Sequence, residues 1–108
     1  MHDTFLKIIN RELESKIIYE DDKCIAFYDK FPVQEGHFLV VPKRKSKNLL
    51  ETTDEELFYL MTIAKKLAKE QIIDKFPNSG FKLVINTNEA AGQVIFHTHI
   101  HIIPYIKK

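Results

Sequence analysis

Cysteine is nearly absent from this sequence, and so is any excess of charge of one sign. Cys24 is the only cysteine among 108 residues, which excludes an intrachain disulfide, and its apolar neighbours predict a buried, unreactive thiol. The 16 basic and 15 acidic residues nearly cancel, which argues against binding of long nucleic acid through its phosphate backbone. No apolar run is long enough for a secretory signal or a membrane span. We therefore expect a cytoplasmic protein without a membrane or long nucleic acid as a partner.

The sequence also lacks repeats, linkers and glycine-rich phosphate motifs of the Walker or Rossmann type. Its 108 residues suffice for one hydrophobic core, so we expect residues 1–108 to form a single domain. A phosphate site in this chain must then be built from strands and a loop rather than from a glycine-rich turn at a helix N-terminus.

Three of the five histidines alternate with β-branched residues in the stretch His-Thr-His-Ile-His, residues 97–101. An alternation with period two is typical of a strand and predicts that His97, His99 and His101 line one face. Three groups that titrate near neutral pH are costly to crowd together unless they bind an anion, hold a metal or perform acid, base or nucleophilic chemistry. His2, at the start of the chain, is more simply interpreted as structural.

A zinc site is the main alternative for these histidines, because three imidazole nitrogens and a water can complete a catalytic zinc centre. The loop 86–93 favours an anion instead, since its amides can donate hydrogen bonds to phosphate oxygens and its glycine permits close approach of the backbone. A fourth histidine, His37, opens an apolar strand. Asp29 ends another strand, where it can accept hydrogen bonds from a ribose diol or cap a turn.

The hydrophobic periodicity predicts two helices and further strands. Thr53 and Glu56 form a capping box at the start of the longer helix, whose apolar residues Phe58, Ile63 and Ile73 exceed what one thin sheet needs and indicate a partner surface. A basic run at 43–47 is expected in a solvated loop away from the histidines. The expected helices span 4–13 and 53–75, and the expected strands 17–19, 23–28, 36–42, 81–86 and 97–104.

These motifs together resemble the histidine triad (HIT) family of nucleotide hydrolases and transferases. The resemblance rests on Gly-His-Phe-Leu-Val-Val-Pro-Lys at 36–43, on Asn86, and on Ala-Gly-Gln at 91–93 followed by His-x-His-x-His. It is most specific for the branch of nucleoside phosphoramidate hydrolases. The resemblance implies an α+β domain with a five-stranded antiparallel sheet, one short helix and one long helix. It also implies a homodimer in which the two sheets join edge to edge.

The resemblance further implies hydrolysis of a purine nucleoside 5′-phosphoramidate or a related nucleotidyl conjugate through a nucleotidyl-histidine intermediate, without a metal or another cofactor. The nucleophile would be His99, supported by His101 and His37 on the phosphate or the imidazole network and oriented by His97. The remaining implied contacts are Asp29 to the ribose, Asn86, Gly92 and Gln93 to the phosphate, and Phe5, Ile8 and Phe27 to the base.

The sequence departs from the family pattern at three places, two of them near the substrate. Val94 replaces a common Ser or Thr near the leaving group, and Lys30 replaces an apolar residue near the base. The ligands of a structural zinc found in many bacterial-type members are replaced by Asp3, Leu6 and Lys45.

Hydrolysis is favoured over transfer because the transferase branch has Gln where His101 stands. Two alternatives remain open: a dinucleoside polyphosphate hydrolase, and a nucleotide-binding adaptor with incidental catalysis.

Overall fold

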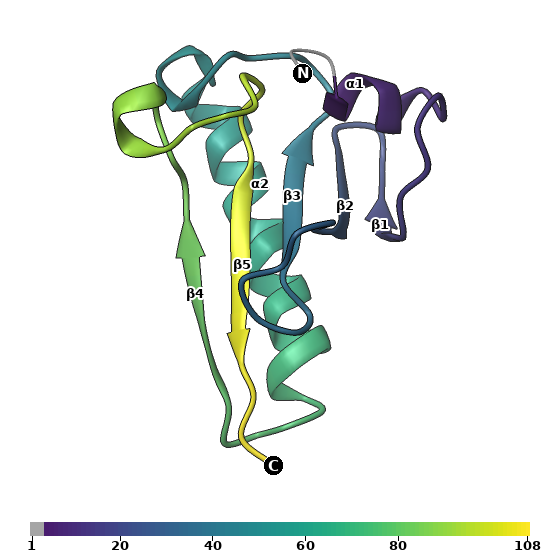
Figure 1. Cartoon of the computed structure of the whole chain (residues 1–108), viewed down its shortest axis with the longest axis vertical. Helices are drawn as coiled ribbons and strands as arrows, with labels where there is room; N and C mark the ends of the chain where they lie inside the picture. Colours follow the sequence, from purple (N-terminus) through teal and green to yellow (C-terminus); the bar gives the residue numbers. More distant parts are fainter. Residues whose placement is uncertain (1–3) are drawn as a thin grey trace.

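Five strands and two α-helices form the fold, which the computed structural model describes for residues 4–108 (Figure 1). His2 and Asp3, named above, lie outside the described residues. Two short 3-10 turns, η1 and η3, and a π-helical turn, η2, complete the chain. The elements in order are α1 (Thr4–Ile9), β1 (Ile17–Glu20), β2 (Cys24–Tyr28), β3 (Phe38–Pro42), η1 (Leu49–Glu51), α2 (Asp54–Ala68), η2 (Lys69–Ile73), β4 (Gly80–Val84), η3 (Glu89–Ala91) and β5 (Ile100–Tyr105).

The strands form one antiparallel sheet in the order β1-β2-β3-β5-β4. The central strands β3 and β5 pair in a register that places Leu39 opposite His101 and Val40 opposite Ile100. The strand β4 lies at one edge, and β1 lies at the other. This architecture confirms the expected α+β class with five antiparallel strands, one short helix and one long helix.

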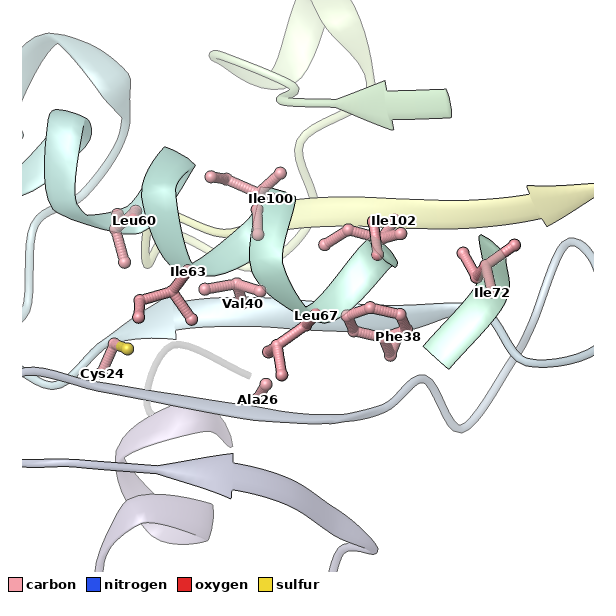
Figure 2. Close-up of a cluster of buried hydrophobic side chains, with 12 residues drawn as sticks. Cys24, Ala26, Phe38, Val40, Leu60, Ile63, Leu67, Ile72, Ile100 and Ile102 are labelled. Carbon is pink, nitrogen blue, oxygen red and sulfur yellow. The ribbon is translucent and has the colours of Figure 1, made fainter. Parts of the chain in front are cut away.

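The two helices cover opposite faces of the sheet because each strand presents alternate side chains to each face. From β3, Phe38 and Val40 join the core under α2, whereas Leu39 and Val41 join a second cluster with α1. Figure 2 shows the first core, in which α2 side chains meet strand side chains. Its labelled members are Cys24, Ala26, Phe38, Val40, Leu60, Ile63, Leu67, Ile72, Ile100 and Ile102.

The long helix α2 begins as expected, with Thr53 and Glu56 forming a reciprocal capping box. Its apolar face is less exposed than the sequence suggested. Ile63 is buried in the core and Ile73 packs against it, so neither widens an exposed surface. On this helix, Phe58 and Met61 are the large apolar side chains that remain exposed, at 77% and 37%.

The short helix α1 ends at Ile9, four residues before the expected end at Leu13. Arg11 adopts a left-handed conformation, with φ of 64°, which interrupts the helix. The Arg11 N–H donates to the Ile8 carbonyl, and the Arg11 guanidinium donates hydrogen bonds to the carbonyls of Ile8 and Ile9 at the end of the helix. Leu13 is thereby left in a loop beside the sheet.

Cys24 is fully buried in β2, and burial raises the pKa of its thiol to about 12. This placement confirms the expected burial of Cys24, and a buried thiol with a raised pKa is typical of an unreactive cysteine. None of the helices within residues 4–108 has both the length and the apolar character needed to cross a membrane.

Candidate active site

The histidine row leads into β5, on the face of the sheet that carries α1. The paired strand begins at Ile100, not at His97 as expected. The neighbouring strand β3 ends at Pro42. Because proline has no backbone N–H, it cannot donate the hydrogen bond that would extend the pairing of β3 with β5. The residues before Ile100 bond instead to the last residue of β3 and the chain that follows it: the ring of His97 to the Pro42 carbonyl, and the Thr98 N–H to the Ser46 carbonyl.

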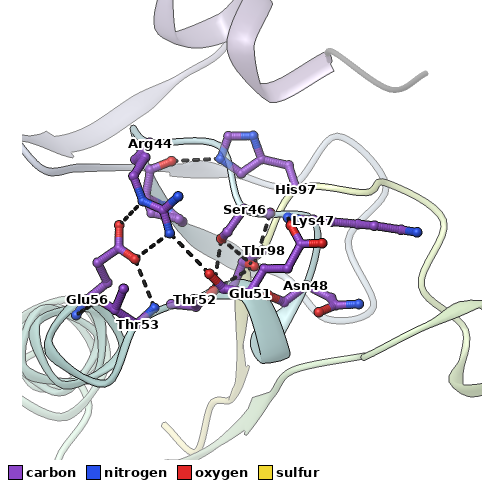
Figure 3. Close-up of polar contacts among 11 residues, drawn as sticks. Arg44, Ser46, Lys47, Asn48, Glu51, Thr52, Thr53, Glu56, His97 and Thr98 are labelled. Carbon is purple, nitrogen blue, oxygen red and sulfur yellow. Dashed lines mark hydrogen bonds and ion pairs between the residues drawn. The ribbon is translucent and has the colours of Figure 1, made fainter.

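A cluster of three buried hydroxyl groups secures this segment from its other side (Figure 3). The Ser46 hydroxyl lies 2.8 Å from that of Thr98 and 2.9 Å from that of Thr52, and the Thr52 and Thr98 oxygens are 2.9 Å apart. Because buried hydroxyls are costly without partners, this closed set specifies one arrangement of the segment. It holds Thr98 fixed between the two histidines.

His99 occupies a position suited to a nucleophile. Its Nδ1 lies 2.7 Å from the His97 carbonyl oxygen, which can only accept, so Nδ1 carries the proton and the lone pair is on Nε2. The ring of Phe5 packs edge-on against the imidazole, with centroids 4.9 Å apart. Burial lowers the pKa of His99 from its ordinary value of 6.5, so the ring is neutral at pH 7.

His97 acts on His99 through its backbone rather than through its ring. The His97 Nε2 donates to the Pro42 carbonyl over 2.7 Å, which fixes the ring inside the protein. Its Nδ1 is buried without a hydrogen-bond partner among the described residues. Burial lowers the pKa of His97, which also keeps this ring neutral. The carbonyl that orients His99 is thereby held in place.

His37 and His101 form a hydrogen-bonded pair whose proton positions are set by the backbone. The Val33 N–H donates to Nδ1 of His37 over 3.1 Å, so neutral His37 carries its proton on Nε2. That nitrogen lies 3.0 Å from Nδ1 of His101 and donates to it. His101 must then hold its own proton on Nε2. Burial, with the neighbouring His99 and His37, lowers the pKa of His101 to about 4, and burial also lowers that of His37.

Asp29 lies beside this pair, with its Oδ2 3.5 Å from His37 Nε2 and 3.9 Å from His101 Nδ1. Among residues 4–108, these three residues bring potential metal-ligand atoms within 4.8 Å of one another. The chemistry of the donors does not fit a metal, because Val33 N–H requires His37 Nε2 to keep its proton, whereas a ligating nitrogen must be deprotonated. The arrangement suits a carboxylate that accepts hydrogen bonds from a diol.

A cavity of about 600 Å³ extends from the histidines toward α1. Most of the predicted site residues line it, and His37, His97 and Gln93 do not. His37 contacts the lining residue His101, and His97 contacts the lining residue Phe5. Tyr28 and Leu39 also line the cavity, although they were not predicted from the sequence. The predicted residues that line the cavity are Phe5, Ile8, Phe27, Asp29, Asn86, Gly92, His99 and His101.

Gln93 is placed differently from the expected contact with a phosphate. Its side chain is buried, donates to the carbonyls of Lys47 and Ile95, and accepts from the Asn88 N–H. Because the amide has no hydrogen left for a ligand, we correct its role to bracing the loop. Gly92 does line the cavity, and its left-handed φ of 94° explains why glycine stands there.

The basic run 43–47 was expected far from the histidines, which is wrong. The carbonyls of Pro42, Ser46 and Lys47 bond to the histidine segment and its loop, so the run lies beside them. Two of its cations are nevertheless committed elsewhere, Lys43 to Glu20 and Arg44 to Glu56. No residue of the run lines the cavity.

Two functional elements were missed from the sequence. The alternation that places His37 and Leu39 on one face of β3 could have identified Leu39 as a cavity residue. The Val33 N–H has no comparable signal, because it is a backbone group on an exposed loop residue.

Comparisons with known proteins agree with this geometry. Residues 10–108 match the model of the HIT domain. An uncharacterized 13.1 kDa HIT-like protein of Mesomycoplasma hyorhinis is 56% identical over 104 residues, which cover 96% of this chain and 93% of that protein. The adenylylsulfatase HINT3 of Arabidopsis thaliana is 41% identical over 100 residues, 93% of this chain but 50% of that protein.

A solved structure extends the similarity to three dimensions. The histidine triad nucleotide-binding protein ST2152 of Sulfolobus tokodaii superposes with a TM-score of 0.88 at 46% identity, covering 97% of this chain and 70% of that one. The shared sheet and helices and the four clustered histidines accord with these matches. This chain belongs to the HIT family of nucleotide-binding hydrolases.

Proposed function

We propose that this protein hydrolyses purine nucleoside 5′-phosphoramidates, and related nucleotidyl conjugates, through a nucleotidyl intermediate on His99. The observation that carries the proposal is the hydrogen bond from His99 Nδ1 to the His97 carbonyl, which leaves the lone pair on Nε2 at the cavity. A neutral imidazole is a competent nucleophile, and burial keeps this one neutral.

In the first step, His99 Nε2 attacks the α-phosphorus, the new P–N bond forms and the bond from phosphorus to the leaving amine breaks. The amine must take one proton to depart as a neutral molecule. At rest His101 is neutral at pH 7, since its pKa is about 4, and a neutral imidazole is a poor acid. An anionic phosphate in the cavity would raise that pKa, so substrate binding would charge His101. The added proton would sit on Nδ1, where the hydrogen bond from His37 must yield and the Asp29 carboxylate lies 3.9 Å away, and Nε2 would donate its proton to the amine as the general acid.

In the second step, water attacks phosphorus and transfers one proton to His101, and the bond to His99 breaks to release the nucleotide. Throughout, Nδ1 of His99 keeps its proton, and the His97 carbonyl stabilises the cationic intermediate. Asp29 would bind the ribose hydroxyls, and Phe5, Ile8 and Phe27 would contact the base. Asn86 and Gly92 would adjoin the phosphate.

We expect adenosine 5′-phosphoramidate to exceed diadenosine tetraphosphate in kcat/KM by at least about tenfold. A polyphosphate leaving group carries several negative charges, and among the described residues that line the cavity the only cation is Lys30. The measurement is a steady-state comparison on one enzyme preparation, with adenylyl sulfate included because the plant relative is named an adenylylsulfatase. A higher value for the tetraphosphate would favour the polyphosphate hydrolase instead.

We also propose that the protein is a homodimer. The edge strand β4 has no neighbour on its outer side within the described chain, and Phe58 on α2 is 77% exposed. Sedimentation at micromolar concentration should give a dimer for the wild type and a monomer for Phe58→Lys. A matched control is Phe31→Lys, which changes an 82% exposed phenylalanine beside the cavity and should remain dimeric. A monomeric wild type would contradict the proposal.

A further inference from the structure

The end of the cavity that lies away from the histidines carries polar groups to which no role has yet been assigned. A second cavity of about 640 Å³, which no histidine lines, adjoins the first one. Residues common to both therefore mark the far end of the nucleotide cavity. They are Ile8, Leu13, Glu14, Ser15 and Lys30. If the α-phosphate lies at His99, as the proposed function requires, this end receives the outer edge of the base.

The apolar walls of the cavity cannot distinguish one purine from another. Side chains such as Phe5, Ile8 and Phe27 contact the faces of a base, and purine faces are alike. Discrimination requires hydrogen bonds to the edge, which differs between guanine and adenine. The polar side chains at the far end are Glu14, Ser15 and Lys30. The Ser15 hydroxyl both donates and accepts and so suits either base, whereas Glu14 only accepts and Lys30 only donates.

Both side chains are free to bind a ligand. Within residues 4–108, neither Glu14 nor Lys30 forms an ion pair or a hydrogen bond, whereas nearby Arg11 is bonded to Glu20 and to α1 carbonyls. Both are solvent-exposed, so ordering them costs side-chain entropy and their hydrogen bonds compete with water. Their effect should therefore be a modest selectivity rather than strict exclusion.

We propose that Glu14 and Lys30 read the edge of the base and make the site prefer guanine to adenine. Guanine presents two adjacent donors, N1–H and the N2 amino group, which one carboxylate can accept together, and its O6 and N7 can accept from an ammonium group. Adenine offers the carboxylate a single donor, the N6 amino group, beside an N1 lone pair that repels the second oxygen. A carboxylate paired with a lysine thus complements guanine more fully.

Calorimetric titration with GMP and AMP tests this inference without relying on turnover. We expect the wild type to bind GMP about tenfold more tightly than AMP, the low end of what a bidentate contact provides. Glu14→Gln should reduce the ratio to less than about twofold, and Lys30→Met should weaken GMP about threefold. The matched control is Glu12→Gln, an exposed glutamate outside both cavities, which should keep the full ratio.

Equal affinities in the wild type, tighter binding of AMP, or a guanine preference that survives in Glu14→Gln would each overturn the inference. The same preparations are assayed with guanosine and adenosine 5′-phosphoramidates, where the wild type should show the same ratio in kcat/KM. Failure to turn over either compound, with the GMP preference intact and dependent on Glu14, would reject the proposed reaction and leave the reading of the base edge standing.

Discussion

Replacement of His99 by alanine should lower turnover of a nucleoside phosphoramidate by several orders of magnitude, while nucleotide binding stays within about tenfold of the wild type. The large effect is expected because His99 Nε2 is the atom that bonds to phosphorus, and the neighbouring imidazoles are held by other partners. Binding should survive because the cavity walls and Asp29 remain. Single-turnover kinetics and calorimetry with AMP provide the two measurements.

A second variant separates loss of the nucleophile from loss of structure. In His99→Gly, added imidazole can enter the vacated space and should restore part of the turnover, which a misfolded protein would not allow. Brief reaction with radiolabelled substrate should label the wild type on His99. Label on any other histidine would contradict the assignment. Wild-type turnover by His99→Ala would show that His99 is not the nucleophile.

Replacement of Val33 by proline should lower kcat by about ten- to hundredfold, although the Val33 side chain is 63% exposed. Proline removes the N–H that donates to His37 Nδ1 and alters none of the four imidazole side chains chemically. Without that donor, Nδ1 can take a proton, so the pKa of His37 should rise. The acid limb of the rate profile should therefore move to higher pH, which a purely structural defect would not produce.

Val33→Ala is the matched control for this experiment, since it shortens the same side chain but keeps the N–H. It should retain the wild-type rate and pH profile. Thermal unfolding of both variants shows whether the loop change affects stability. If the proline variant is folded and keeps the wild-type kcat and acid limb, the proposed proton positions on His37 and His101 are wrong.

The strands and the long helix could be predicted because their hydrophobic periodicity reflects a single buried face. The capping box at Thr53 even gave the start of α2. The end of α1 could not be predicted, because the left-handed conformation of Arg11 has no local signal in its residue type. The start of β5 was misplaced for a related reason: alternation indicates which face a side chain occupies, not which backbone groups are paired.

The residues of the candidate site also fall into those that could be predicted from the sequence and those that could not. Histidines and aspartate could be recognised because their chemistry lies in the side chain. Gln93 was misjudged because its residue type suits both a phosphate and a buried brace, and only the positions of the Lys47 and Ile95 carbonyls decide between them. The Val33 N–H could not be predicted because any non-proline residue supplies that group.

The central position of β3 and β5 has a consequence for how this protein can diverge. Central strands with neighbours on both sides open only when the molecule unfolds, whereas loops vary with little effect on the core. The end of the cavity that we propose receives the base is formed by loop residues such as Glu14, Lys30 and Phe31. If the proposed base site is correct, substitutions at these positions would change which nucleotide is accepted, while the Pro42 carbonyl at the end of β3 would still hold the ring of His97. Substitutions in the loops could thus change the substrate range of the protein while the histidines of the candidate site are kept.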